Sequence, residues 1–211
     1  MPVLDGVAMT ISAADLADFI ERLDTASARH EQALNAADAR LGDGDTGSML
    51  KRILAAMVAA DARQSDDLPG AARRLAQATM KETGSSLGTL VATALMTLAR
   101  QAGSRGGALA ADDMADVTAA MADAVAERGK ASAGDKTVLD SLRAVAEALR
   151  TGPATEATAA RAARAALEDF RGRPCRIGRA RMFPERSTDA DDPGMLAAAL
   201  LLDDVETIDA Q

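Results

Sequence analysis

The chain of 211 residues contains no tryptophan, no tyrosine and only three phenylalanines. Aromatic side chains supply the surfaces on which single-stranded nucleic acids stack, so this mode of binding is disfavoured. Residues that favour strands are scarce, whereas alanine and leucine, which favour helices, are abundant. The lack of large rings therefore indicates a helical protein whose core consists of small and flexible side chains.

Histidine and cysteine each occur once, as His30 and Cys175. A single cysteine cannot form an internal disulfide and is expected as a free thiol in a reducing compartment. With one residue of each kind, a zinc site or a Cys–His nucleophile pair is disfavoured. We expect His30 in the middle of a helix, in a surface or packing role.

Positive charge is also in deficit, because the net charge is −8. An acidic chain is a poor partner for phosphate backbones, so we expect no nucleic-acid partner. No basic stretch followed by an apolar run opens the sequence, and no segment approaches eighteen uninterrupted apolar residues. We therefore expect neither a signal peptide nor a membrane-spanning helix, and a cytoplasmic location.

Apolar residues recur at helical spacing and predict an all-α fold of eight helices with short connections and no strand. The expected helices cover about 13–37, 48–62, 69–82, 87–101, 112–128, 137–150, 154–171 and 193–202. Short links between helices of similar length imply antiparallel neighbours. Residues 1–211 are expected to form one domain, with residues 1–11 as an arm, residues 172–192 irregular and the acidic tail 204–211 frayed.

Three carboxylates gather on a flexible stretch, where Asp38 precedes the loop Gly42-Asp43-Gly44-Asp45-Thr46-Gly47-Ser48. Residues two apart in an extended loop point the same way, so Asp43 and Asp45 can converge, and Asp38 can join them. Mg²⁺ prefers such oxygen ligands, and the amides that open the next helix favour phosphate. The sequence therefore predicts a magnesium–phosphate site. The alternative is a solvated acidic turn in which aspartate or threonine caps the helix.

An EF-hand is excluded, because Leu54 stands at the twelfth position of the loop, where glutamate is needed. Gly84-Ser85-Ser86 opens a helix and suits either phosphate binding or a simple serine cap. The stretch from Gly129 to Thr137 is not a Walker A motif, because Asp135 separates Gly134 from Lys136 and no strand precedes it. Asp135 and Thr137 could simply cap the helix that follows.

The region 161–186 carries eight arginines against three acidic residues, a net charge of +5. Such a patch suits a nucleotide phosphate or an acidic partner, and the alternative is a solvated helix face followed by a basic loop.

In this order, four pieces of the sequence resemble the nucleotide-binding L subunit, or L domain, of dihydroxyacetone kinases. The pieces are Asp38…Gly42–Ser48, Gly84-Ser85-Ser86, Gly134–Asp140, and Gly178-Arg179-Ala180…Glu185-Arg186-Ser187…Asp192-Pro193-Gly194. The resemblance covers nearly the whole chain. It implies a barrel of eight antiparallel helices with the nucleotide bound in loops at one end.

The resemblance also implies the residues of the site. Two Mg²⁺ ions that bridge the phosphates of ATP or ADP would be bound by Asp38, Asp43 and Asp45. The phosphates would be contacted by Thr46, Gly47, Ser48, Met49, Ser85 and Ser86. The nucleotide pocket would be lined by Gly129, Val138 and Arg179 and closed by Asp192. No other catalytic side chain is implied, which fits phosphoryl transfer, since this reaction needs positioning and charge neutralisation rather than a protein nucleophile.

Members of this family act as half of an enzyme of glycerol and carbohydrate metabolism. In this family the acceptor, a small ketose, is held covalently through a histidine on a separate K subunit or K domain. The resemblance therefore implies a phosphotransferase subunit that is active only with a K-type partner. It leaves a homo-oligomer open.

Two branches of the family differ in their phosphate source. One uses ATP directly, and the other keeps ADP as a bound cofactor and usually has histidine where this chain has Thr46. This residue favours the ATP-dependent branch. The alternatives are the ADP-cofactor branch, the nucleotide domain of a fatty-acid kinase, which shares Asp-Gly-Asp-Thr-Gly, and a non-catalytic nucleotide-binding regulator.

The chain departs from the family pattern at Arg181-Met182-Phe183-Pro184, at Asp189-Ala190-Asp191 and at Met195. These positions fall where a lid and the contact with the K subunit are expected. They leave open an acceptor other than dihydroxyacetone, such as a four-carbon ketose.

Overall fold

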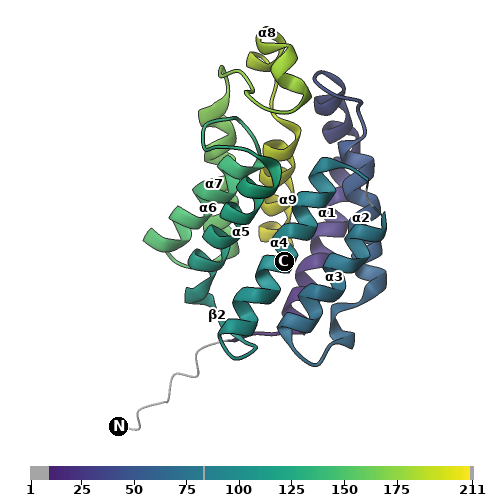
Figure 1. The fold of residues 1–211 in the computed structure, drawn as a ribbon, viewed down its shortest axis with the longest axis vertical. Helices are drawn as coiled ribbons and strands as arrows, with labels where there is room; N and C mark the ends of the chain where they lie inside the picture. The colour runs from purple at the N-terminus through teal and green to yellow at the C-terminus, as the bar shows by residue number, and fades with distance from the viewer. Residues whose placement is uncertain (1–9, 83, 210–211) are drawn as a thin grey trace.

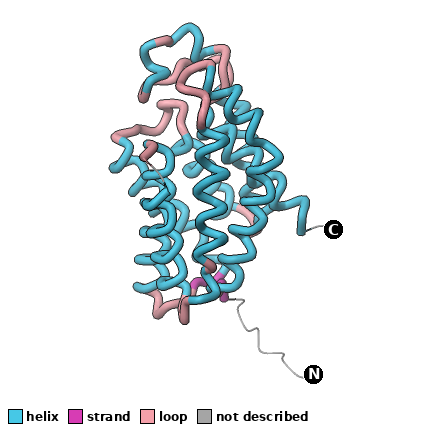
Figure 2. The backbone as a smooth tube through the Cα atoms, turned by 90° about the vertical axis from the view of Figure 1, so that its right-hand side faces the viewer, coloured by secondary structure: helices cyan, strands magenta, loops and turns pink. Residues whose placement is uncertain are grey.

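A computed structural model describes the backbone of residues 10–82 and 84–209. Long helices run side by side along the longest axis of the molecule, and the connections gather at its two ends (Figure 1). The view from the side shows the same arrangement (Figure 2). The predicted all-α class is confirmed.

Eight long helices make up the described part of the chain, as the sequence predicted. They are α1 (Ala13–Ala39), α2 (Thr46–Ala60), α3 (Leu68–Glu82), α4 (Ser86–Ser104), α5 (Met114–Gly129), α6 (Val138–Thr151), α7 (Glu156–Phe170) and α9 (Pro193–Asp209). A one-turn helix, α8 (Pro184–Thr188), precedes the last of them, and short 3₁₀ turns cover Ala62–Gln64, Ala111–Asp113 and Arg179–Met182. The segment expected to be irregular thus contains two short helical turns.

The eight long helices close into a ring. Each packs against the next in the chain, α7 packs against α9, and α9 returns to α1. Alanines that are fully buried, including Ala26, Ala71, Ala102 and Ala163, allow the helix backbones to approach closely. This agrees with a core made without large rings.

The alternation of directions decides where the predicted site residues lie. Because neighbouring helices are antiparallel, α2, α4, α6 and α9 all begin at the same end of the barrel, the upper end in Figure 1. The acidic loop, the serine pair, the loop before α6 and the segment before α9 are the connections at that end. We call this the site end.

Two expectations about the ends of the chain are wrong. A short strand β1 (Thr10–Ile11) pairs antiparallel with β2 (Leu109–Ala110), although no strand was predicted, because two residues are too short to show periodicity. The last helix does not end at residue 202 but continues to Asp209, with Val205 fully buried. The predicted frayed tail is therefore helical from residue 204 to 209. Of the predicted arm, residues 1–9 lie outside the described residues, as do residues 210–211 of the tail.

The backbones of α1 and α2 approach each other closely at Gly47. A Cβ atom at this position would overlap the carbonyl oxygen of Glu31 and would lie 2.9 Å from Oδ1 of Asn35. Backbone thus meets backbone here, and only glycine fits without moving one helix.

We expect Gly47→Ala to lower the free energy of unfolding by about 1–3 kcal/mol, because the added methyl group forces α1 and α2 apart. The matched control is Gly103→Ala in α4, where nothing lies within 4 Å of the added carbon. That control should raise stability by about 0.5–1 kcal/mol, since alanine is the better helix former. Urea unfolding measures both variants, and equal effects would contradict the close contact.

Candidate functional site

The carboxylate of Asp38 organises the acidic loop. Asp38 lies in the last turn of α1 and is 9% exposed. Its Oδ2 accepts hydrogen bonds from the amides of Gly44 and Asp45, both at 2.9 Å, and of Thr46 at 3.3 Å. Gly44 takes a left-handed conformation (φ 80°) that lets the chain turn around this oxygen. The other carboxylate oxygen, Oδ1, lies on the side of Gly42.

The predicted convergence of three carboxylates is confirmed. One carboxylate oxygen of Asp38, one of Asp43 and one of Asp45 lie within 4.8 Å of one another. Asp43 and Asp45 are exposed, and Asp45 makes no side-chain cap hydrogen bond to α2. The alternative of a simple cap therefore explains Asp38 but not Asp45. Oxygen ligands at this spacing suit a hard divalent cation such as Mg²⁺.

Four residues of the first turn of α2 were expected to contact phosphate, and the structure places them in two different settings. Thr46 and Gly47 are buried at the start of the helix, where the amides have no carbonyl partner inside the helix. The Thr46 amide donates instead to Asp38. Such a helix start attracts anions. Since the acidic loop joins this helix start directly, a cation held there would lie beside amides suited to phosphate.

Ser48 and Met49 have other partners. The Ser48 amide donates to Oδ1 of Asn35 at 3.1 Å, and its hydroxyl donates to Oε1 of Glu31 at 3.0 Å. The Met49 side chain is 3% exposed in a core cluster, and its amide donates to the carbonyl of Asp45 at 2.8 Å. Both residues therefore hold α2 in place, and the structure gives neither an uncommitted amide for phosphate.

Sequence reasoning missed Glu31 and Asn35. Their spacing to Asp38, four and then three residues, places all three on one face of α1. Hydrogen bonds from Lys51 and Ser48 hold the pKa of Glu31 below its ordinary value. This polar face of α1 binds the first turns of α2 through Ser48 and Lys51, and the i, i+4, i+7 pattern of polar residues was the signal.

The serine pair opens α4 as a cap. The Ser85 hydroxyl accepts a hydrogen bond from the Gly88 amide at 3.0 Å, so the capping interpretation is confirmed for this residue. Ser86 is exposed in the first turn of the helix. The pair keeps its predicted place at the site end, with one hydroxyl committed to the cap.

The starts of α6 and α9 meet. Thr137 caps α6 as predicted, but its partner in the capping box is Asp140 rather than Asp135, which accepts the Ser132 amide. Asp192 caps α9 by accepting the Met195 amide at 2.8 Å. A Cβ atom on Gly194 would lie 3.2 Å from Cβ of Val138, so the structure brings Val138 and Asp192 together.

Gly129 ends α5 and faces Leu90 of α4, to whose Cδ2 a Cβ atom would lie 3.5 Å away. The predicted pocket residue Arg179 begins a 3₁₀ turn, and its side chain lies outside the described part.

Most arginines of the basic region contact partners within the protein. Arg171 forms ion pairs with Glu168 and Asp191, and Arg164 pairs with Asp203. The guanidinium of Arg173 lies 4.7 Å from the ring centroid of Phe170. For these residues the alternative interpretation, a solvated helix face followed by a basic loop, holds.

Two further sequence expectations concern the single histidine and cysteine. His30 lies partly buried in α1, with Nε2 3.2 Å from Oδ2 of Asp204 in α9, which fits a packing role. Cys175 is a buried free thiol, and burial raises its pKa to about 11. A thiol of this kind is protonated at neutral pH and a poor nucleophile.

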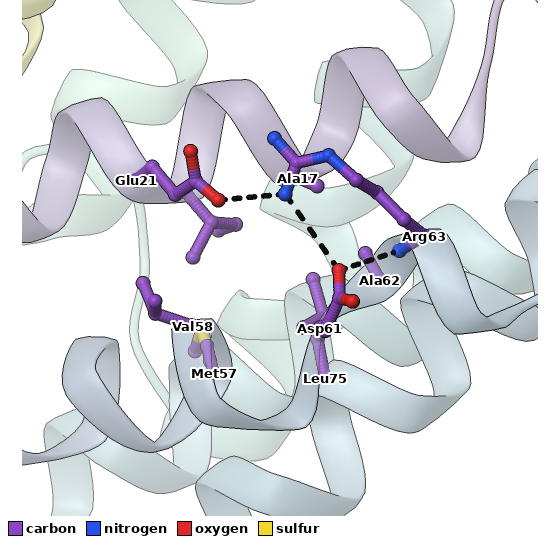
Figure 3. Close-up of a pocket in the computed structure, with 9 residues that line it drawn as sticks. Ala17, Glu21, Met57, Val58, Asp61, Ala62, Arg63 and Leu75 are labelled. Atoms are coloured by element: carbon purple, nitrogen blue, oxygen red, sulfur yellow. Dashed lines mark hydrogen bonds and ion pairs between the residues drawn. The ribbon is translucent and has the colours of Figure 1, made fainter.

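A hollow lies away from the acidic loop, between the start of α1, the end of α2 and α3 (Figure 3). Arg63 spans it and pairs with Glu21 at 2.6 Å, and it also contacts Asp61 and Asp18. The hollow has no room for a water molecule and is therefore not a ligand site.

None of the described helices combines the length and the apolar run that crossing a bilayer needs.

Comparison with known proteins gives one consistent family. Residues 40–207 match the DAK2 domain. The chain is 29% identical over 187 residues to the ADP-binding subunit DhaL of PEP-dependent dihydroxyacetone kinase 1 from Listeria innocua, covering 88% of this chain and 89% of that protein. It is 33% identical over 199 residues to L-erythrulose 1-kinase from Mycolicibacterium smegmatis, covering 87% of this chain but only 33% of that protein.

The fold is shared with a solved structure, the dihydroxyacetone kinase of C. freundii. The TM-score is 0.73 at 22% identity, over 98% of this chain and 37% of that chain. The same kinase in complex with AMP-PNP and Mg²⁺ gives a TM-score of 0.70. The resemblance drawn from the four sequence pieces is thereby confirmed.

Partial burial raises the pKa of Asp192 to about 6, with the Asp140 carboxylate adding to the effect. The raised pKa means that the folded state binds a proton between about pH 4 and 6 that the unfolded state has released. Ionised Asp192 therefore lowers stability as the pH rises through this window.

We expect Asp192→Asn, which keeps the cap of α9, to be more stable than wild type by about 1–3 kcal/mol at pH 7. The difference should vanish near pH 4, grow until about pH 6 and then stay constant. Urea unfolding of both proteins in EDTA between pH 4 and 8 measures it. A difference independent of pH would show that the carboxyl group is ordinary.

Proposed function

Because the chain belongs to the DAK2-domain family, we propose that residues 1–211 form a single L-type domain, the nucleotide-binding subunit of a two-component ketose kinase. It binds ATP or ADP together with Mg²⁺. It passes a phosphoryl group to a ketose that a separate K-type subunit holds. The observation that carries the proposal is the convergence of Asp38, Asp43 and Asp45 beside the start of α2.

The donor set fits magnesium. Three carboxylates supply hard oxygens within 4.8 Å of one another, and two of them are exposed to an arriving ligand. Because Oδ2 of Asp38 accepts three amides, five carboxylate oxygens remain for the proposed pair of ions, with water and phosphate oxygens as the other ligands. Bound Mg²⁺ would supply charge neutralisation for the phosphates. Asp38, fixed by three amides, keeps the loop in the shape that the cluster needs.

The remaining residues take separate roles in the proposal. Gly47 meets the phosphates through its amide at the start of α2, and Thr46 through its side chain, because the Thr46 amide donates to Asp38. Ser85 and Ser86 meet the phosphates at the start of α4. Gly129, Val138 and Arg179 line the pocket, and Asp192 closes it. Ser48 and Met49 contribute by anchoring α2, because their amides are committed to Asn35 and Asp45. No side chain serves as a nucleophile, since phosphoryl transfer proceeds by positioning and electrostatics.

The relatives support the choice of acceptor and partner. The Listeria relative is named as a subunit of a dihydroxyacetone kinase, and this chain covers 89% of its length. We therefore propose a separate partner that carries the acceptor. The Mycolicibacterium relative is named for a four-carbon ketose, which extends the proposed acceptors from dihydroxyacetone to erythrulose. Thr46, where the ADP-cofactor branch usually has histidine, favours ATP as the direct donor.

We expect the chain, mixed with a K-type subunit, ATP and Mg²⁺, to phosphorylate dihydroxyacetone or erythrulose. Asp43→Ala should lower the rate by about 100-fold or more, because phosphate charge is left uncompensated. Its unfolding free energy should stay within about 0.5 kcal/mol of wild type. The matched control is Asp116→Ala, an exposed aspartate of α5 away from the site end, which should keep full activity.

Two outcomes contradict the proposal. Failure to phosphorylate any short ketose with any K-type subunit, whether ATP or a phosphotransferase protein is the donor, would exclude the kinase function. Full activity of Asp43→Ala would mean that the acidic loop is only a turn. Transfer that requires bound ADP and a phosphotransferase protein, with ATP inactive, would assign the chain to the ADP-cofactor branch.

A further inference from the structure

Lys136 is the largest fully buried side chain in the described part of the protein, with an exposed fraction of 1%. Lysine is almost never fully buried unless it is paired, because removal of the ammonium group from water costs free energy. Its backbone is also in the left-handed region, with φ 62°. A buried ammonium group and a left-handed backbone are both unfavourable, so we infer that contacts of the Lys136 side chain compensate for them.

The ammonium group of Lys136 joins two distant parts of the chain. Its Nζ donates to the carbonyl of Arg173 and to the carbonyl of Ser187, each at 2.8 Å. These residues lie near the two ends of residues 173–190, which we call the cap segment and which contains α8 at the site end (Figure 1). One side chain therefore fastens both ends of the cap segment to the loop before α6.

Other contacts make the cap segment one unit. The Arg176 amide donates to the carbonyl of Asp135 at 3.0 Å, next to Lys136. Inside the cap segment, the Cys175 amide donates to the Ser187 hydroxyl at 3.0 Å. Burial lowers the pKa of Lys136, while the nearby Cys175, Asp191 and Asp192 act in the opposite direction.

The cap segment in turn contacts the acidic loop. Leu41, which is 7% exposed, packs in a cluster with Cys175 and Ala190 of the cap segment. Arg186 of the same segment donates to the carbonyl of Arg40 at 3.0 Å. Residues 40 and 41 join Asp38 to the rest of the loop, so the cap segment restrains the piece of chain between the first carboxylate and the other two.

We propose that Lys136 is a positioning residue for the acidic loop. Its ammonium group fixes the cap segment, and the cap segment holds Leu41 and with it the spacing between Asp38 and the pair Asp43 and Asp45. Lys136 itself touches neither the cation nor the nucleotide. The consequence for nucleotide binding rests on the proposed function, whereas the coupling between the two segments does not.

The test is Lys136→Met, which keeps the length of the side chain and removes the ammonium group. We expect hydrogen–deuterium exchange of the full chain without ligand to become faster by about tenfold or more in the cap segment and in residues 38–46, with α3 and α4 unchanged. The affinity for Mg²⁺–ADP should fall by about tenfold, as when a partner of a metal ligand is removed. The control is Leu75→Ala, a 1% exposed core residue of α3, which should not produce this selective pattern.

A second variant keeps the proposal open to refutation if Lys136→Met does not fold. Leu41→Ala removes the contact with the cap segment while Lys136 stays in place. It should speed exchange in residues 38–46 and leave the cap segment protected. Faster exchange of the cap segment in Lys136→Met with residues 38–46 unchanged, or an unchanged loop in Leu41→Ala, would overturn the coupling. If the wild-type protein does not bind Mg²⁺–ADP, the proposed function is refuted instead. The exchange data would still decide whether the cap segment and the acidic loop are coupled.

Discussion

Three backbone amides donate to one buried carboxylate oxygen, Oδ2 of Asp38, and the rest of the site depends on this interaction. The three hydrogen bonds turn the loop so that one carboxylate oxygen from each of Asp38, Asp43 and Asp45 lies within 4.8 Å of the others, while Asp43 and Asp45 stay exposed. Without this anchor, two like charges two residues apart would move away from each other. The hydrogen bonds to Asp38 therefore set the shape of the acidic loop, and the proposed cation binding depends on that shape.

The barrel gives the proposed cation an electrostatic role at the site end. Four long helices, α2, α4, α6 and α9, begin at the site end, and each presents partial positive charge there. The acidic loop and Asp192 place carboxylates among these helix starts, which would repel phosphate. In the proposed function, a divalent cation would remove that repulsion and let the helix amides contact the phosphate oxygens. Close packing at Gly47 and the polar contacts of Glu31 and Asn35 keep α1 and α2 in register for this arrangement.

Local signals in the sequence predicted the helix number, the all-α class and the acidic cluster, because helical periodicity and glycine–aspartate loops are properties of short stretches. Contacts between distant parts of the chain were missed. The pairing of β1 with β2, the continued helix after Leu202 and the commitment of Ser48 to Asn35 and Glu31 all depend on neighbours far along the sequence. In the sequence, Lys136 belongs to a stretch that only partly matches a Walker A motif. The structure shows that its ammonium group donates to two carbonyl groups.

The central claim is that Asp38, Asp43 and Asp45 hold a divalent cation that binds the phosphates of a nucleotide. The most direct measurement is a crystal structure grown with ADP and Mn²⁺ in place of Mg²⁺, with an anomalous difference map at the manganese absorption edge. We expect anomalous peaks at about 2.0–2.3 Å from oxygens of all three carboxylates, adjacent to the nucleotide phosphates. Bound nucleotide with no anomalous peak at this cluster would contradict the account.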